Sequence, residues 1–150
     1  MRPQAHVAAS LLLWSTARDA PLWEAPVDVL AGNLPDLDRT VAKRLGVERR
    51  DHHRWVSHSL VAWLVPTLVL ARHERARRPL AAIWVHLLLD TYADGLAWLW
   101  PWHKDKIGMF RKTPEIHDDG WSTPAPLRTT LGRAELAMWL GTALNLLRRT

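Results

Sequence analysis

Residues 83–100 combine a nearly continuous apolar segment with three ionisable side chains, His86, Asp90 and Asp94. On an α-helix, positions four apart lie on one face, so the three side chains form a stripe on a helix that is otherwise hydrophobic nearly all round. Such a helix is expected at the centre of a fold. Burying an ionised carboxylate is costly unless it is paired or coordinates a metal. The sequence therefore predicts a central helix over residues 80–99, whose stripe forms either a His–Asp ion pair at an exposed end or a metal site.

The rest of the chain favours an all-α fold. The spacing of apolar residues predicts further helices over residues 3–16, 27–32, 39–45, 58–72 and 131–148. Ser57 is the expected N-cap of the helix over 58–72, which is expected to bend near Pro66, and residues 75–79 are expected to be a linker. The sequence has no alternating strand pattern, no repeat and no linker between domains. We therefore expect a single domain over residues 1–150, a bundle of four to five helices.

Residues 101–130 contain Pro, Gly, Asp and Lys without clear periodicity, which predicts a long loop. A structureless loop of this length is uncommon unless it is functional, so it is a candidate cover for a site. His117 lies in it, and like His73 and His103 it matches no motif. These three histidines are therefore expected at the surface.

Composition limits the chemistry. The chain has no cysteine, so any metal must be bound by His, Asp, Glu or backbone oxygen. The absence also fits a reducing compartment such as the cytoplasm. The net charge of +5 and the clusters at Arg49–Arg50, 72–78 and Arg148–Arg149 favour an anionic partner such as nucleic acid, anionic lipid or a phosphorylated substrate. The alternative is that these basic clusters are solvated helix ends and loops without a partner.

Two features bear on membranes. No apolar run reaches the roughly 18 residues of a spanning helix, so we expect no insertion, while peripheral attachment remains open. The ten tryptophans suit a membrane interface, a ligand pocket or a core. Residues 1–17 also have the pattern of a short signal peptide, with Arg2 before the apolar residues 7–14, although the apolar region is short and Ser10 interrupts it.

Three other segments hold candidate ligands. His53 and His58 flank the start of a predicted helix and can converge if His53 lies in the loop before it. Asp36 and Asp38 alternate at a turn after Pro35, an arrangement that can coordinate or bridge metal ions, or can cap a helix. His6 lies in the first predicted helix. Taken alone, each of these residues is also compatible with a surface or capping role.

In this order, the motifs resemble a known family. They are His6, the turn Leu34-Pro35-Asp36-Leu37-Asp38, the segment His53-Arg54-Trp55-Val56-Ser57-His58-Ser59, the helix His86-Leu87-Leu88-Leu89-Asp90, Gly95 and the end Leu99-Trp100-Pro101. Together they resemble the YdjM-like family of metal-dependent hydrolases, which is described as associated with the inner membrane. That family is related in fold to zinc-dependent phospholipase C and single-strand nucleases. The chain departs from the family pattern at Arg39, where a histidine is common, and at Trp55, where a glycine is common.

The resemblance implies a set of site residues. The implied metal ligands are His6, Asp36, His53, His58, His86 and Asp90. Asp38 is implied as a catalytic group that bridges metals or takes the proton of an attacking water, and Arg54 as a donor to a substrate phosphate oxygen. Zinc suits mixed imidazole and carboxylate ligands first, with manganese or iron as alternatives. So many candidate ligands leave room for more than one metal.

The predicted function is hydrolysis of phosphoester bonds by a metal-activated water. The substrate class stays open between lipid, nucleic acid and small molecules. One alternative is a protein whose metal is structural or whose chemistry is lost, as Arg39 suggests. The other is a non-catalytic basic helical module that binds nucleic acid or an anionic membrane surface. Such a module would bind in a salt-dependent manner without needing a metal.

Overall fold

The computed structural model describes residues 3–17, 19–46, 53, 55–93, 95–108 and 130–149. This part of the chain contains six α-helices, which confirms the all-α prediction and exceeds the expected four to five. Their bounds are α1 Pro3–Thr16, α2 Glu24–Asn33, α3 Leu37–Arg44, α4 Leu60–Leu70, α5 Glu74–Ala93 and α6 Thr130–Leu147. A short 3-10 turn, η2 Val56–His58, precedes α4.

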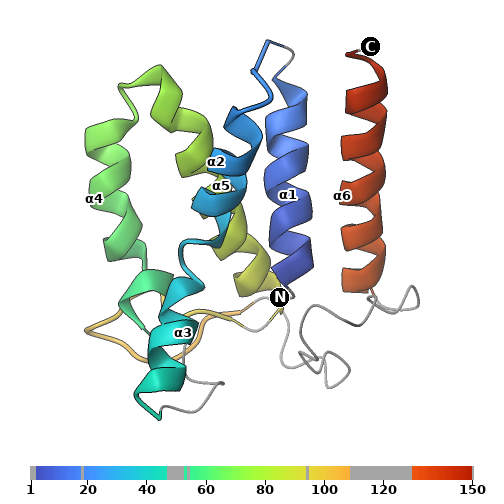
Figure 1. Cartoon of the computed structure of the whole chain (residues 1–150). Helices are drawn as coiled ribbons and strands as arrows, with labels where there is room; N and C mark the ends of the chain where they lie inside the picture. The colour runs from blue at the N-terminus through green and yellow to red at the C-terminus, as the bar shows by residue number, and fades with distance from the viewer. Residues whose placement is uncertain are drawn as a thin grey trace.

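Helices α1 and α5 occupy the middle of the bundle (Figure 1). Helix α1 packs against α2, α5 and α6, and α4 lies on the far side of α5. The inner faces of α1 and α2 carry small residues, which let the two backbones approach closely. A Cβ atom on Gly32 would lie 2.1 Å from Oγ of Ser10, so only glycine fits there without movement. This close approach places the backbone of α2 next to the interior of the bundle.

The core beside α5 is built from aliphatic side chains and tryptophan. Ala31, Ile83, Leu87 and Leu96 form a buried cluster, and Trp63, Trp84 and Trp98 pack against it. The predicted central position of this helix is thus confirmed. Its apolar residues on several faces meet α1, α2 and α4.

The predicted bounds of the central helix, 80–99, were wrong at both ends. Helix α5 begins at Glu74, within the expected linker, where Arg78 forms ion pairs with Glu24 and the fully buried Asp28 of α2. It ends at Ala93, because Gly95 adopts a positive φ of 75° and donates its backbone N–H to the carbonyl of Asp90 at 2.9 Å. A glycine in this conformation is a common helix terminator.

Three other predictions need correction. Ser59, not Ser57, caps α4: Oγ of Ser59 accepts the N–H of Ala62 at 3.3 Å, because η2 occupies the preceding residues. Helix α2 begins at Glu24 instead of residue 27, since Pro26 in a first turn needs no hydrogen-bond donor. The expected structureless loop begins with a folded part, in which Ile107 forms an antiparallel bridge with Leu96, a residue before the loop. Residues 109–129, the rest of that loop, lie outside the described residues.

The remaining bounds agree closely with the predictions. Helix α1 matches residues 3–16, and α6 starts and ends one residue before the predicted 131–148. Arg149, after α6, donates hydrogen bonds to the carbonyls of Trp14 and Ala20 at 3.0 and 3.3 Å. It therefore links the two helices instead of contributing to a free basic patch. Within the described ranges, every helix is too short or too polar to cross a bilayer.

Candidate metal centre

Four polar segments meet at one end of the bundle. Figure 1 shows that the start of α1, the α2–α3 connection, the start of α4 and the end of α5 lie at the same end. His6 comes from α1, Asp36 from the α2–α3 connection, His58 from η2, and His86 and Asp90 from successive turns of α5. The fold thus brings distant residues to one place.

Asp90 is at the centre of this cluster and is fully buried. Its Oδ2 atom lies 3.1 Å from Nε2 of His86, 3.4 Å from Nε2 of His53 and 3.6 Å from Nε2 of His58. Its Oδ1 atom lies 3.2 Å from Nε2 of His6. Four imidazoles therefore direct the same ring nitrogen, Nε2, toward a single carboxylate. All four rings are buried.

Asp36 completes the cluster on its more exposed side. Its Oδ1 atom lies 3.7 Å from Nε2 of His58 and 3.9 Å from Nε2 of His86, and its side chain is 16% exposed. One ligand atom from each of Asp36, His58, His86 and Asp90 lies within 4.8 Å of the other three. That spacing allows all four atoms to bind one metal ion.

In two of these histidines, the other ring nitrogen, Nδ1, contacts a polar oxygen outside the cluster centre. Nδ1 of His86 donates to the carbonyl oxygen of Gly32 at 2.7 Å. Nδ1 of His58 lies 3.1 Å from Oδ2 of Asp38, which also accepts a hydrogen bond from Ser57 Oγ. A neutral imidazole that donates through Nδ1 keeps the lone pair on Nε2. Metal-binding histidines in proteins are commonly oriented by this kind of hydrogen bond.

His6 and His86 stack with their ring centroids 3.7 Å apart. Burial is the main cause that lowers the pKa of His6 to about 4, so this imidazole is neutral near pH 7. Both nitrogens of His6 and Nε2 of His86 are buried without a hydrogen bond, although Asp90 is near. Buried polar atoms are rarely left this way unless an ion or water is bound there. This observation fits a bound cation.

The charges in the cluster are strongly coupled. Burial alone would raise the pKa of Asp90, but nearby positive charge, first from the N-terminal amino group and then from His6, His86 and His53, holds that pKa well below its usual range. Burial would lower the pKa of His58, but hydrogen bonds to Asp36, Asp38 and Asp90 raise it to about 10. Without a metal, His58 is therefore protonated near pH 7. In the metal-free protein, the positive charge of His58 offsets the charge of the neighbouring carboxylates. A bound divalent cation would offset the same negative charge.

The structure thus gathers His6, Asp36, His53, His58, His86 and Asp90 in one cluster, and places Asp38 behind His58. Arg54, Asp94 and His117 lie outside the described residues. His73 and His103 are exposed, as expected. Arg39 is partly exposed in α3.

Sequence reasoning missed two groups that orient the histidines, Ser57 and the carbonyl of Gly32. Ser57 was assigned to capping, although its position directly before His58 was a signal that it could serve the site. The Gly32 carbonyl has no signal in the sequence, because it depends on how α2 packs beside α5.

Comparison with protein families identifies a relationship. The model of a family described as YdjM inner membrane protein matches residues 1–147. No curated protein and no solved structure matches the chain.

Proposed function

The chain belongs to the YdjM family, and from the geometry of its His–Asp cluster we propose that it is a metal-dependent hydrolase of phosphoester bonds. One observation carries the proposal: four buried imidazoles direct Nε2 toward Asp90, and a hydrogen bond holds Nδ1 of two of them from behind. An ion pair in a protein core requires only one histidine for each carboxylate. Four histidines around one carboxylate indicate that a cation of higher charge belongs among them.

Zinc is the metal that this donor set suits best. Imidazole nitrogen and carboxylate oxygen are common zinc ligands, and manganese or iron accept the same donors. Asp36, His58, His86 and Asp90 supply four donors whose atoms lie close enough for one ion. His6 faces the other oxygen of Asp90, so these two residues would be candidates to hold a second ion.

The roles of the chain's own residues follow from their positions. A divalent ion supplies Lewis acidity and lowers the pKa of a nearby water, which is the chemistry that hydrolysis needs. Gly32 fixes His86, and Asp38 with Ser57 fixes His58, so both imidazoles are oriented in advance. Asp36 is the most exposed of the charged groups and marks the side from which a substrate can approach.

Within this proposal, Asp38 acts by orienting His58, while a direct part in proton transfer remains the prediction from the family resemblance. Arg54 stays a candidate donor to a substrate phosphate oxygen. The net charge of +5 favours an anionic substrate, as a phosphoester of a lipid, a nucleic acid or a small molecule would be.

The family description also bears on where the protein works. We place it on the cytoplasmic side of the inner membrane, attached at the surface. The family is described as an inner membrane protein, while every described helix is too short or too polar to cross a bilayer. Both facts are compatible with peripheral attachment.

Metal content tests the proposal directly. Elemental mass spectrometry would be applied to protein purified without an affinity tag, alongside His86→Ala, His53→Ala and the exposed control His103→Ala. We expect one or more equivalents of zinc in the wild type and the control, and loss in the other two variants while circular dichroism shows a retained fold. A folded wild type that takes up no metal after reconstitution would refute the proposal.

Turnover separates the enzyme from the non-catalytic alternative. The metal-loaded protein would be assayed with bis(p-nitrophenyl) phosphate, a generic phosphodiester. Hydrolysis that disappears on chelation and returns with zinc supports the hydrolase. Stable metal binding without hydrolysis of this compound or of phospholipid and oligonucleotide substrates would indicate a structural metal instead.

A further inference from the structure

Helix α4 is apolar on the face that it presents to solvent. Its sequence, LVAWLVPTLVL, has no charged residue, and none of its side chains is buried. Six aliphatic side chains are exposed: Val61, Leu64, Val65, Leu68, Val69 and Leu70. The most exposed are Leu68, at 70%, and Val65, at 59%. We call these six side chains the outer stripe of α4.

The outer stripe follows the periodicity of one helix face. Positions 61, 64, 65 and 68 have the i, i+3, i+4, i+7 spacing that normally faces a core, and position 69 continues this face. Leu70 lies outside this spacing and is exposed at the C-terminal end of the helix. In α4 the opposite face is the one attached to the bundle. Trp63 Nε1 donates to the carbonyl of Ser57 at 2.6 Å, and Thr67 Oγ1 accepts from Trp84 Nε1 at 2.9 Å. The polar anchors therefore point inward and the aliphatic stripe points outward, the reverse of a soluble surface helix.

Basic side chains are concentrated at the C-terminal end of the stripe. Arg72, Arg75 and Arg77 are exposed in the α4–α5 turn and the start of α5, with Glu74 as an exposed acidic neighbour. Two of the arginines bind the end of α4 itself. Nε of Arg72 donates to the carbonyl of Val69 at 3.0 Å, and Nε of Arg77 to that of Ala71 at 2.9 Å. The guanidinium groups are thus fixed directly beside the apolar stripe.

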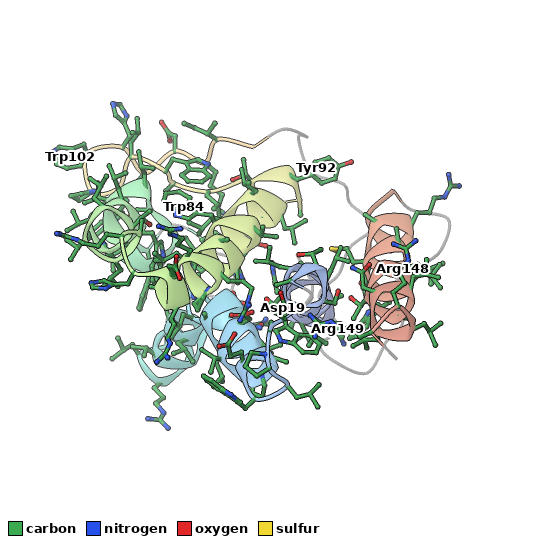
Figure 2. The ribbon with its side chains drawn as sticks, turned by 90° about the horizontal axis from the view of Figure 1, so that it is seen from above. Asp19, Trp84, Tyr92, Trp102, Arg148 and Arg149 are labelled. Atoms are coloured by element: carbon green, nitrogen blue, oxygen red, sulfur yellow. The ribbon has the colours of Figure 1, made fainter. Side chains whose placement is uncertain are left out.

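A tryptophan lies on the same side of the molecule. Trp102 is 73% exposed, and Figure 2 shows it at the outer edge next to α4. Its segment is joined to the start of α4, since the N–H of Leu60 donates to the carbonyl of Trp98 at 2.9 Å. Exposed tryptophan and arginine beside aliphatic side chains are typical of surfaces that enter the interface of a bilayer.

We propose that the outer stripe of α4 docks into the surface of a bilayer that contains anionic lipid. Arg72, Arg75 and Arg77 would meet the headgroups, while the aliphatic side chains enter the boundary of the acyl chains. An 11-residue helix is about 16 Å long, roughly half the thickness of the hydrocarbon core. Helix α4 therefore lies in the interface and does not span it. The inference builds on the membrane location proposed above and is independent of the metal centre.

A bilayer fits this surface better than a second copy of the chain. The stripe of another α4 would cover the aliphatic side chains, but it would also bring together two groups of three exposed arginines, each with only Glu74 as an acidic neighbour in the α4–α5 turn and the start of α5. An anionic bilayer offers both an apolar interior and negative headgroups. Each basic residue near such a surface strengthens binding by about fivefold.

Vesicle flotation of the full chain tests the proposal. The vesicles would consist of phosphatidylcholine, with or without phosphatidylglycerol. The variant Val65→Ser/Leu68→Ser should weaken binding about a hundredfold, because two exposed aliphatic side chains no longer enter the bilayer. The matched control is Leu140→Ser/Leu144→Ser in α6, whose side chains are 55% and 56% exposed and which should bind like the wild type. Arg75→Gln should lose about fivefold on anionic vesicles only.

Each outcome has a definite meaning. Equal binding by the wild type and the α4 variant, or equal loss in the α6 control, would refute α4 as the docking surface while leaving the membrane location intact. Absence of vesicle binding by the wild type would refute both. A wild-type dimer that the α4 substitutions dissociate, without vesicle binding, would assign the stripe to a second copy. Leu64→Ser/Val69→Ser serves as a second α4 variant if the first does not fold.

Discussion

Replacing Asp38 with alanine removes the carboxylate that holds His58 from behind. In the structure, Oδ2 of Asp38 lies 3.1 Å from Nδ1 of His58, while Nε2 of the same ring faces Asp36 and Asp90. Loss of such an orienting partner typically lowers metal affinity 10- to 100-fold, or about 1.4–2.7 kcal/mol. We expect this loss for Asp38→Ala. Asp38→Asn should lose less, because its amide oxygen can still accept the Nδ1–H.

A competition titration against a chelating dye measures this effect, with the exposed Asp105→Ala as control. The two assignments of Asp38 predict different results. If Asp38→Ala abolishes metal binding as completely as His86→Ala, then Asp38 is itself a ligand and the orienting role is refuted. If metal affinity is unchanged but kcat for phosphodiester hydrolysis falls, then Asp38 acts in proton transfer, as the family resemblance implies.

Two further predictions concern charge. Arg78→Met leaves the buried carboxylate of Asp28 without its cation and should lower the free energy of unfolding in urea by about 3 kcal/mol near pH 7. Burial raises the pKa of Asp28, so the folded protein tolerates the neutral form of this side chain better than the charged form. The loss of stability in Arg78→Met should therefore shrink as the pH falls. An equal loss of stability in Arg75→Met would contradict this reasoning. Zinc binding near pH 7 should release a proton from His58, whose pKa is about 10, and none from His6, whose pKa is about 4. Calorimetry of zinc binding in two buffers of different ionisation enthalpy measures this proton release. A binding heat that does not depend on the buffer would contradict the prediction.

The fold was predictable where local signals decide it. Pro3 before an apolar run defined α1, and the apolar residues around His86 and Asp90 identified the central helix. Its N-terminal end was mispredicted because a tertiary contact determines it. Arg78 pairs with α2 across the bundle, which extends α5 back through Pro79. Apolar residues continue to Trp100, which masked the helix-terminating role of Gly95.

The site was predictable as a set of residues and not as a geometry. The resemblance of the ordered motifs to the YdjM-like family predicted that four separate segments contribute to one site. Which nitrogen of each ring faces inward depends on partners from other elements. The carbonyl of Gly32 reaches His86 because α2 packs against α5. No local pattern encodes that contact.

The position of α4 connects the two proposals. Only Ser59 separates His58 of the metal cluster from the first residue of α4, so a bilayer that binds α4 also lies close to the cluster. This proximity favours a lipid phosphoester over a nucleic acid as substrate. Val65→Ser/Leu68→Ser should then lower the turnover of phospholipid in vesicles about as strongly as it lowers vesicle binding, and leave turnover of bis(p-nitrophenyl) phosphate unchanged. Equal loss of both activities would show that the stripe supports the metal cluster instead of presenting substrate to it.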